Sequence, residues 1–458
     1  MKMNVNMLWK RCFTYITNLV GISIDLFVSN PYTERVIIIH IERVRKTGKE
    51  SIMKIKQLVV LILILVVMAG LGNSVAYVAS LCVHPTGAGR CFTTIQAAVD
   101  AANSGDQILI RAGNYVEQVV IRGKDLTLVG RSGAVIQAPA VMQDTLSPVF
   151  GFPGRPLLLA TEAEVIVRDL TIDGANSAES NPFLQGIVFL NAGGVIRGNI
   201  VKDTGFGDPR LPLDENGFPV YQGDGIVVIN FSGTHRSVTI TENRVSNFNN
   251  NGILVDAEAD FNDPAIANLT VQVTNNTVVG SGQNGVIDQW AMFIGGFGFA
   301  DPSSSITGTI RGNRIRDLVT VGDYPLPGIG IVMFNPYNLE VAQNTVENVN
   351  VGMAANQVVG AQITRNQIAG PGPDVFGSSG LLISGMDSSV VNNRFRKLDT
   401  GILLFVDDPQ LGSAANTVMD DNNFDSVAMD VMTSPGTPMG LAAADAKVSS
   451  LWTKLPHR

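Results

Sequence analysis

The sequence predicts an all-β solenoid, in which one chain winds into stacked coils of short parallel strands. Two recurring patterns support this prediction. The first pattern is a glycine followed by a short apolar run. The second is an asparagine, then any one residue, then an apolar residue, and the two patterns alternate strictly along the chain. The composition agrees, because 45% of the residues are hydrophobic, only 16% are charged and 47 are glycine.

The glycine pattern marks the start of one strand in each coil. Its glycines are Gly186, Gly225, Gly252, Gly285, Gly330, Gly352, Gly380 and Gly401. The asparagine pattern marks one turn of each coil. It contains Asn243, Asn276, Asn313, Asn344, Asn366, Asn393 and Asn422, and Asn199 fits it loosely. We expect these asparagines to bond to their neighbours in the coils above and below, as side-chain ladders do in stacked strands.

The spacing of the two patterns gives the size of one coil. The shortest step from glycine to asparagine is 13 residues and the shortest step from asparagine to glycine is 8, so the minimal repeat is 21–22 residues. That length accommodates three short strands at about 3.3 Å per residue, with coils stacked about 4.8 Å apart. Since no coil can bury its apolar face alone, stability depends on stacking.

The first segment after residue 91 strengthens a resemblance to a known family. The run from Phe92 to Val116, followed by the strand-like Asp125-Leu-Thr-Leu-Val-Gly, resembles the opening of secreted right-handed parallel β-helices of the pectin-lyase superfamily. The resemblance covers about 92–430. Residues 93–103 are predicted to form a helix with one apolar face that caps the first coil and protects its strand edges. Leu441 to Trp452 could form a second cap at the other end.

Residues 53–76 have the three parts of a secretory signal peptide. A short basic stretch precedes a 15-residue apolar run from Leu58 to Gly72, and small residues lead to a cut after Ala76. We therefore expect translation to start at Met53 and residues 1–52 to be a mis-called upstream extension. The alternative is an uncleaved anchor with a cytoplasmic arm. The predicted β-helix domain spans 77–430, and 431–458 form a C-terminal tail or cap.

The charge and the cysteine content indicate which partners and which cellular location to expect. Residues 77–458 contain 22 basic and 36 acidic residues, which argues against a nucleic-acid partner. Cys82 and Cys91 are predicted to form one disulfide in an exported protein, and the alternative is two free thiols. The sequence predicts a secreted or cell-surface protein with no membrane span after cleavage.

Insertions predict a groove formed by the loops of about 203–324. Three consecutive coils, starting at Gly225, Gly252 and Gly285, have glycine-to-asparagine steps of 18, 24 and 28 residues. The opposite turn is also long between Asn199 and Gly225, and between Asn313 and Gly330. Insertions at one turn of successive coils project together and commonly mark the binding face of a solenoid.

The same loops supply candidate substrate-binding residues. The aromatic side chains of Tyr221, Trp290, Phe297 and Tyr324 offer flat platforms for sugar rings, and Arg314 is a candidate for a charged substrate group. The alternatives are a small satellite core under a long loop, which would include Phe293 and Phe297, and a merely exposed strand face for the arginine.

Asp256 and Asp288 are the candidate catalytic pair. Each ends the glycine-initiated run of its coil, and adjacent coils could place the carboxylates about 5–9 Å apart, which covers retaining and inverting glycosidases. The alternative is that both are turn-forming residues, since asparagine occupies this position elsewhere. Asp256, Asp260 and Asp263 are a candidate Ca²⁺ site, the only cofactor suggested, with a solvated acidic loop as the alternative.

Two functions remain open at this stage. One is an enzyme that binds and cleaves a polysaccharide as a lyase or glycoside hydrolase, and the other is a non-catalytic surface adhesin or matrix protein that binds a polysaccharide or cell-surface glycan. Motifs of the best-known activities in the family are incomplete. Gln143-Asp-Thr-Leu matches a tetrapeptide of pectin methylesterases, but Leu157 follows Gly154-Arg-Pro where those enzymes have tryptophan. No histidine stands between two glycines, as polygalacturonases require.

Overall fold

The computed structural model describes residues 23–25, 38–40, 79–149, 152–205, 223–257, 269–284, 289–295, 306–320, 327–372, 375, 378–406, 414 and 416–435. The chain divides into two compact units, Met1–Tyr77 and Val78–Arg458. In the first unit, β1 (Ser23–Asp25) pairs antiparallel with β2 (Ile38–His40). The predicted signal peptide lies outside the described residues. No helix among the described ranges is long and apolar enough to span a membrane.

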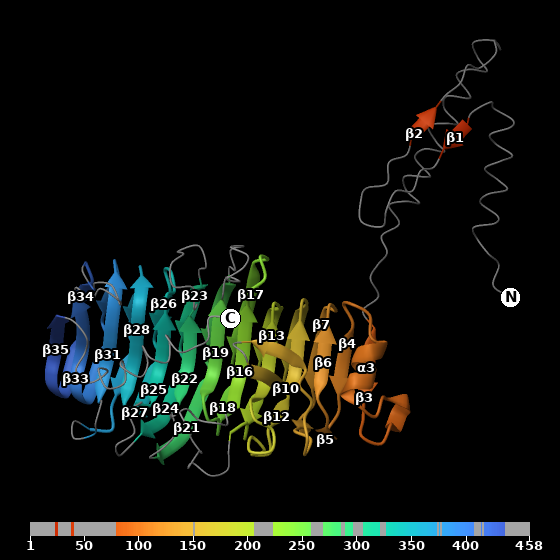
Figure 1. Cartoon of the computed structure of the whole chain (residues 1–458), viewed down its shortest axis with the longest axis horizontal. Helices are drawn as coiled ribbons and strands as arrows, with labels where there is room; N and C mark the ends of the chain where they lie inside the picture. The colour runs from red at the N-terminus through yellow and green to blue at the C-terminus, as the bar shows by residue number, and fades with distance from the viewer. Residues whose placement is uncertain are drawn as a thin grey trace. The chain divides into compact units, whose positions relative to one another are not determined.

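The second unit is a coil of parallel strands arranged in three ladders, which each turn of the coil visits in the order A, B, C. Figure 1 shows its strands following one another in chain order, from the orange end at α3 to the blue end at β35. Ladder A contains β6 (Val119–Arg122), β10 (Phe152–Thr161), β13 (Leu184–Leu190), β16 (Gly223–Asn230), β19 (Asn251–Ala257), β22 (Trp290–Gly295), β25 (Ile329–Phe334), β28 (Val351–Val359), β31 (Ser379–Met386) and the second halves of β33 (Arg394–Val406) and β35 (Asn423–Pro435).

Ladders B and C complete each turn. Ladder B contains β3 (Ser80–Val83), β4 (Gln107–Ile110), β7 (Leu126–Gly130), β11 (Glu164–Arg168), β14 (Gly193–Arg197), β17 (Arg236–Thr241), β20 (Leu269–Thr274), β23 (Ile306–Arg311), β26 (Glu340–Ala342), β29 (Gln362–Thr364), β32 (Ser389–Val391) and β34 (Val418–Asp420). Ladder C contains β5 (Gly113–Val116), β8 (Ala134–Gln137), β12 (Thr171–Asp173), β15 (Ile200–Lys202), β18 (Arg244–Ser246), β21 (Thr277–Asn284), β24 (Arg314–Thr320), β27 (Thr345–Val349), β30 (Gln367–Ala369) and the first halves of β33 and β35.

All pairings between successive turns are parallel, as predicted. Among the described strands of this unit, one pair is antiparallel and joins β9 (Leu146–Val149) to the start of β10. The interior is a single apolar column, because alternate residues of all three ladders point inward and are almost fully buried. In β16, for example, Ile226 and Val228 belong to this interior core, whereas Val227 belongs to a separate cluster outside it. This alternation is the period of two that strands impose on their side chains.

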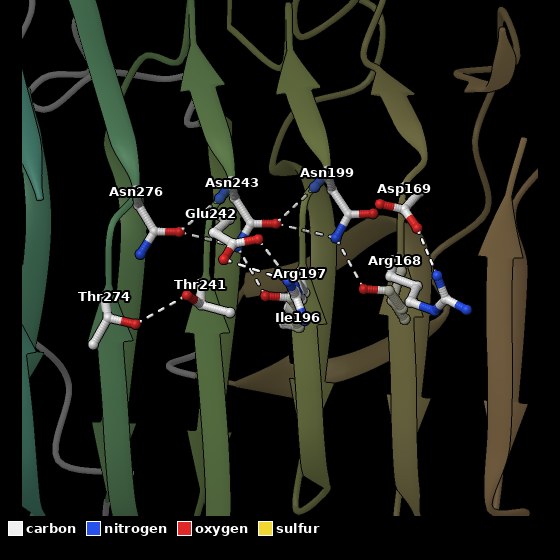
Figure 2. Close-up of polar contacts among 11 residues, drawn as sticks. Arg168, Asp169, Ile196, Arg197, Asn199, Thr241, Glu242, Asn243, Thr274 and Asn276 are labelled. Carbon is white, nitrogen blue, oxygen red and sulfur yellow. Dashed lines mark hydrogen bonds and ion pairs between the residues drawn. The ribbon is translucent and has the colours of Figure 1, made fainter. Parts of the chain in front are cut away.

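The predicted asparagine ladder is confirmed at the turn between ladders B and C. Asn243 donates from Nδ2 to the carbonyl of Ile196 at 2.8 Å and to Asn276 Oδ1 at 3.0 Å, and its backbone N–H donates to the same Oδ1 at 3.0 Å. Figure 2 shows this arrangement for Asn199, Asn243 and Asn276. The same bonds recur through Asn313, Asn344, Asn366, Asn393 and Asn422. The step from Asn344 to Asn366 is 22 residues, the predicted minimal turn.

The ladder matters because these amides are buried where the strands bend. Asn276 and Asn313 are completely buried, and a buried polar group without a partner is costly. The side-chain amide of each asparagine donates to a backbone carbonyl of the preceding turn. Its side-chain oxygen accepts hydrogen bonds from the asparagine of that same preceding turn. The ladder therefore ties each turn to its neighbours in one fixed register.

The predicted N-terminal helix is present as α3 (Ile95–Ala101). The Thr94 side chain accepts a hydrogen bond from the Ala97 N–H at 3.3 Å, and the Glu117 carboxylate accepts from the first helical N–H groups at 2.8 and 3.0 Å. Both contacts satisfy donors that a helix start leaves free. Ile95, Ala98 and Val99 pack into the core. The role of α3 in protecting strand edges stays a prediction. The predicted disulfide between Cys82 and Cys91 is formed.

Replacing one ladder asparagine should destabilise the β-helix strongly. Asn276→Ala removes the partner of the Ile240 carbonyl and the acceptor of the Asn243 N–H, both inside the coil. Two unsatisfied buried groups cost about 1–3 kcal/mol each, so we expect the free energy of unfolding in urea to fall by about 3 kcal/mol or more. Gln272→Ala, an exposed position on the same turn, should change it by less than about 0.5 kcal/mol. Equal losses in the two variants would contradict a stabilising ladder.

Candidate functional site

The long connections of the sequence leave the coil at the two edges of ladder A. The connections after β16, β19 and β22 all run from ladder A to ladder B, as expected from their equal positions in the repeat. The segments 206–222, 285–288 and 321–326 run from ladder C to ladder A. In each of these turns, the strand of ladder A therefore has one connection before it, from ladder C, and one after it, to ladder B. The outward-facing residues of β16, β19, β22 and β25 are therefore the candidate site, called face A below.

Register places the side chains of face A in three rows. The middle row contains Val227, Leu254, Phe293 and Val332. The row at the strand starts contains Asp224, Asn251, Trp290 and Ile329, and the row at the strand ends contains Ile229, Asp256, Gly295 and Phe334. Face A is thus apolar along its centre, and its carboxylates lie near its two edges.

The apolar centre of face A forms clusters separate from the interior core. One contains Phe293 with Val332 and Phe334, and another contains Val227 with Val188 and Ile229. Most of these side chains are buried although they point out of the coil, and Phe293 is only 2% exposed. For Phe293 the structure therefore favours the alternative of a satellite core. Leu254 and Trp290 remain partly exposed.

Trp290 is the aromatic residue of face A that the sequence singled out, and its ring is held in place. It stacks on Phe293, with ring centroids 5.7 Å apart and an interplanar angle of 17°. Its backbone N–H donates to the Asn250 carbonyl at 2.9 Å. Because β19 and β22 pair in parallel, Trp290 lies beside Asn251 on the neighbouring strand. The indole of Trp290 is therefore a fixed and partly exposed part of face A, and it lies next to Asn251 at the start of β19.

Asp224 is a buried carboxyl that the sequence analysis did not select. Its Oδ1 accepts hydrogen bonds from the Asn251 backbone N–H at 3.0 Å and from Asn251 Nδ2 at 3.1 Å. Burial raises the pKa of Asp224 above its usual range, and the hydrogen bonds from Asn251, Asn250 and Gln185 only partly oppose that rise. The polar pair Asp224 and Asn251 thus spans two adjacent turns at one edge of face A.

Asp256 lies at the other edge of face A and is completely buried. Its partners in register are Ile229 on one side and Gly295 on the other. Asp288 lies outside the described residues. The expectation that Asp288 ends the ladder A strand of its turn is wrong, because that strand is β22, which begins at Trp290 and places Gly295 beside Asp256. The catalytic role of the pair stays a prediction.

The two described carboxyls of face A do not form a glycosidase pair. Asp256 pairs with Ile229, which lies five positions after Asp224 on β16. At about 3.3 Å per residue, Asp224 and Asp256 are therefore about 16 Å apart along the strands. Inverting glycosidases keep their carboxyls within about 9.5 Å and retaining enzymes within about 5.5 Å. Within face A as described, a catalytic pair needs a carboxylate from a connecting segment.

The remaining predicted site residues divide into two groups. Tyr221, Phe297, Tyr324, Asp260 and Asp263 lie outside the described residues, so the Ca²⁺ site with Asp256 stays a prediction. Arg314 is exposed on β24, in ladder C, and so lies on a different ladder from Trp290. In the described part of the chain, no group of three His, Cys, Asp or Glu residues could hold a metal ion.

Comparison with solved structures finds similar chains at low sequence identity. An exopolygalacturonase of family 28 from Yersinia enterocolitica matches with a TM-score of 0.43 and 14% identity, covering 79% of each chain. The DFA-IIIase of Arthrobacter chlorophenolicus A6 matches with a TM-score of 0.43 and 13% identity, over 74% of this chain and 86% of that chain. The A-module of a mannuronan C-5 epimerase from Azotobacter vinelandii matches with a TM-score of 0.41 and 14% identity, over 75% and 94%.

The chain is a right-handed parallel β-helix. No protein-family model matches its sequence, and no curated protein sequence matches it. Since one such fold hosts many chemistries, the function has to follow from the residues of face A.

The buried carboxyl of Asp224 should make stability depend on pH. Its raised pKa means that the folded protein holds the proton more tightly than the unfolded chain, whose value is about 3.8. This contribution to stability is fully present below pH 3.8 and is lost as the pH rises through the raised pKa. Asp224→Asn keeps an oxygen that accepts from Asn251 and carries no charge. Its free energy of unfolding should therefore increase relative to the unmodified protein as the pH rises from 4 to 8.

Urea unfolding at a series of pH values measures this difference. Asp224→Ala is the matched control, since it removes both the charge and the acceptor and should be less stable than Asp224→Asn at every pH. A difference between Asp224→Asn and the unmodified protein that stays constant from pH 4 to pH 8 would show that Asp224 is not a buried, proton-retaining carboxyl.

Proposed function

We propose that the protein binds a polysaccharide or cell-surface glycan on face A. The observation that supports this function is the partly exposed side chain of Trp290, stacked on Phe293 and lying beside Asn251. A rigid aromatic ring covers the apolar face of a sugar, and neighbouring amide and carboxyl groups hydrogen bond to its hydroxyls. Trp290 offers the first element, and in this proposal the acidic connections at the edges of face A would supply the second.

The position of face A supports a polymeric ligand. Turns of a β-helix repeat at about 4.8 Å, so a ligand lying along the coil axis crosses several equivalent strands. The connections at both edges of face A are rich in acidic and aromatic residues, including Tyr221, Asp260, Phe297 and Tyr324. Connections of this composition suit a chain of sugars better than a small molecule.

Cleavage of the bound glycan, by a lyase or a glycoside hydrolase, is the second candidate function. It is favoured by Asp256, a buried carboxyl in the outer rows of face A, one residue before the end of β19. The segment 258–268 follows there and carries Asp260 and Asp263, so a Ca²⁺ ion bound with Asp256 would assist a lyase. Without cleavage, the same face would serve a surface adhesin or a matrix protein.

The protein acts, in this proposal, outside the cytoplasm. The disulfide between Cys82 and Cys91 supports an oxidising location, where such bonds persist. The signal-peptide pattern of 53–76 supports export and cleavage after Ala76. A glycan ligand is encountered at the same location.

Loss of the Trp290 ring should weaken glycan binding while the fold is retained. We expect Trp290→Ala to weaken binding to the preferred polysaccharide at least tenfold, because the stacking surface is lost, and Trp290→Phe to weaken it less. Affinity electrophoresis in gels that contain uronic-acid or neutral polysaccharides measures the effect. Gln272→Ala on ladder B is the control and should bind normally. Full retardation of Trp290→Ala would place the binding site elsewhere, and no retardation of the unmodified protein by any polymer would remove the proposed function.

The cleavage hypothesis predicts products from the same polysaccharides. The purified protein should release reducing ends, or the absorbance of unsaturated uronate, from at least one polymer in the presence or absence of Ca²⁺. Asp256→Asn and Asp288→Asn should each lower the rate by a factor of 100 or more, because each removes an ionisable oxygen. No product from any polymer leaves a non-catalytic binder, and full activity in both variants rejects the proposed pair.

A further inference from the structure

The C-terminal end of the coil is open in the described part of the chain. β34 pairs only with β32, and β35 pairs only with β33, so each presents one strand edge without a partner strand. Such an edge exposes a row of backbone N–H and C=O groups, and natural proteins cover it or blunt it.

The interior column also ends there without cover. Met419, Phe424, Val427 and Val431 pair in register with buried residues of the preceding turn, so they continue the apolar interior. Met419 is 37% exposed and Val431 is 44% exposed, whereas their partners in the preceding turn are completely buried. Phe424 stacks on Phe395 at 5.3 Å, which gives it contact on that side.

The apolar exposure of the described chain is concentrated on this last turn. It holds five of the ten exposed large hydrophobic residues, namely Val418, Met419, Met429, Val431 and Met432. A contiguous apolar surface at one end of a solenoid marks an interface, because terminal repeats otherwise need a polar outer face for solubility.

The first turn of the same coil shows how such an end is covered. α3 packs against β3, β4 and β6 with one apolar face. Val83 and Ile108, which point into the interior from β3 and β4, are completely buried. The two ends therefore differ in that the first has an amphipathic helix against it.

The sequence that follows β35 has the pattern of a second amphipathic helix. Apolar residues recur at helical spacing on one face of 441–455, namely Leu441, Ala444, Val448, Leu451, Trp452 and Leu455. Ser450 and Lys454 fall on the other side, and the charged residues Asp445 and Lys447 flank the apolar face. A helix of this length measures about 22 Å at about 1.5 Å per residue, enough to cross the end of the coil.

The geometry points to residues 441–455 as the cover of the open end: we propose that this segment forms a helix whose apolar face packs on Met419, Phe424, Val427 and Val431. Residues 436–440, which contain two glycines and one proline, connect Pro435 to it and can extend over about 17 Å. A segment tethered so closely has an effective concentration in the millimolar range. It therefore outcompetes a second copy of the chain at ordinary protein concentrations.

Trp452 provides a direct test in the full chain. The sequence has three tryptophans, so Trp9→Phe and Trp290→Phe together leave Trp452 as the only one. Its emission should be blue-shifted and shielded from acrylamide at all protein concentrations. Val431→Asp, at the open end, should red-shift the emission and raise quenching severalfold, while Met386→Asp, at an exposed apolar position of an earlier turn, should leave both unchanged.

A chain that ends at Pro435 tests the same surface without altering it. It should bind an apolar dye such as ANS and self-associate in sedimentation experiments, and a synthetic peptide of residues 436–458 should reverse both effects. Solvent-like emission of Trp452 in the folded full chain would overturn the proposal. So would shielding that disappears on dilution, because the cover would then be a second copy.

Discussion

The buried asparagine at the turn between ladders B and C is the interaction on which the rest of this structure depends. Each one bonds to a carbonyl of the preceding turn and accepts from that turn as well, as Asn276 does with Ile240 and Asn243. This contact fixes the vertical register of the coil, so residues that are 22 to 47 positions apart in sequence become neighbours. Because a slip by one residue would turn every side chain to the other face, register also decides which residues reach face A.

The register that the asparagines fix also determines which side chains lie next to one another on face A. It aligns Val227, Leu254 and Phe293 into an apolar row on the outside of the coil, and it brings Asn251 onto the carboxyl of Asp224. The same register separates Asp224 from Asp256 by most of a strand length. A surface with a fixed aromatic ring is suited to hold a sugar chain. Its chemistry, in the cleavage hypothesis, depends on a group from the connections at its edges.

The sequence was sufficient to predict the repeat, the asparagine ladder, α3 and the disulfide, because each leaves a local signal. The position of the strand in the turn after Asn276 was not predicted correctly. Gly285-Val-Ile-Asp288 fits the glycine pattern, but the longer run from Trp290 to Gly295 forms β22, with Met292 and Ile294 in the core. Where an insertion precedes a strand, a short pattern does not fix its start, and pairing with β19 decides it.

The burial of face A could have been predicted in part. Four consecutive apolar residues, as in Ile226 to Ile229, indicate a strand that is covered on both sides, whereas alternation indicates one covered side. Asp224 was harder to predict, since an acidic residue before a glycine resembles a solvated turn. Its burial results from the neighbouring turn, through Asn251, and no local pattern reports a contact across 27 residues.

Hydrogen–deuterium exchange of the protein with and without a bound oligosaccharide is the most direct test of the central claim, that ligands lie on the outer side of ladder A. Protection should appear in peptides that contain β16, β19 and β22 and in the connections that join them. Peptides of β17, β20 and β23 in ladder B, which belong to the same turns, should exchange at unchanged rates. Protection confined to ladder B or ladder C would contradict the account.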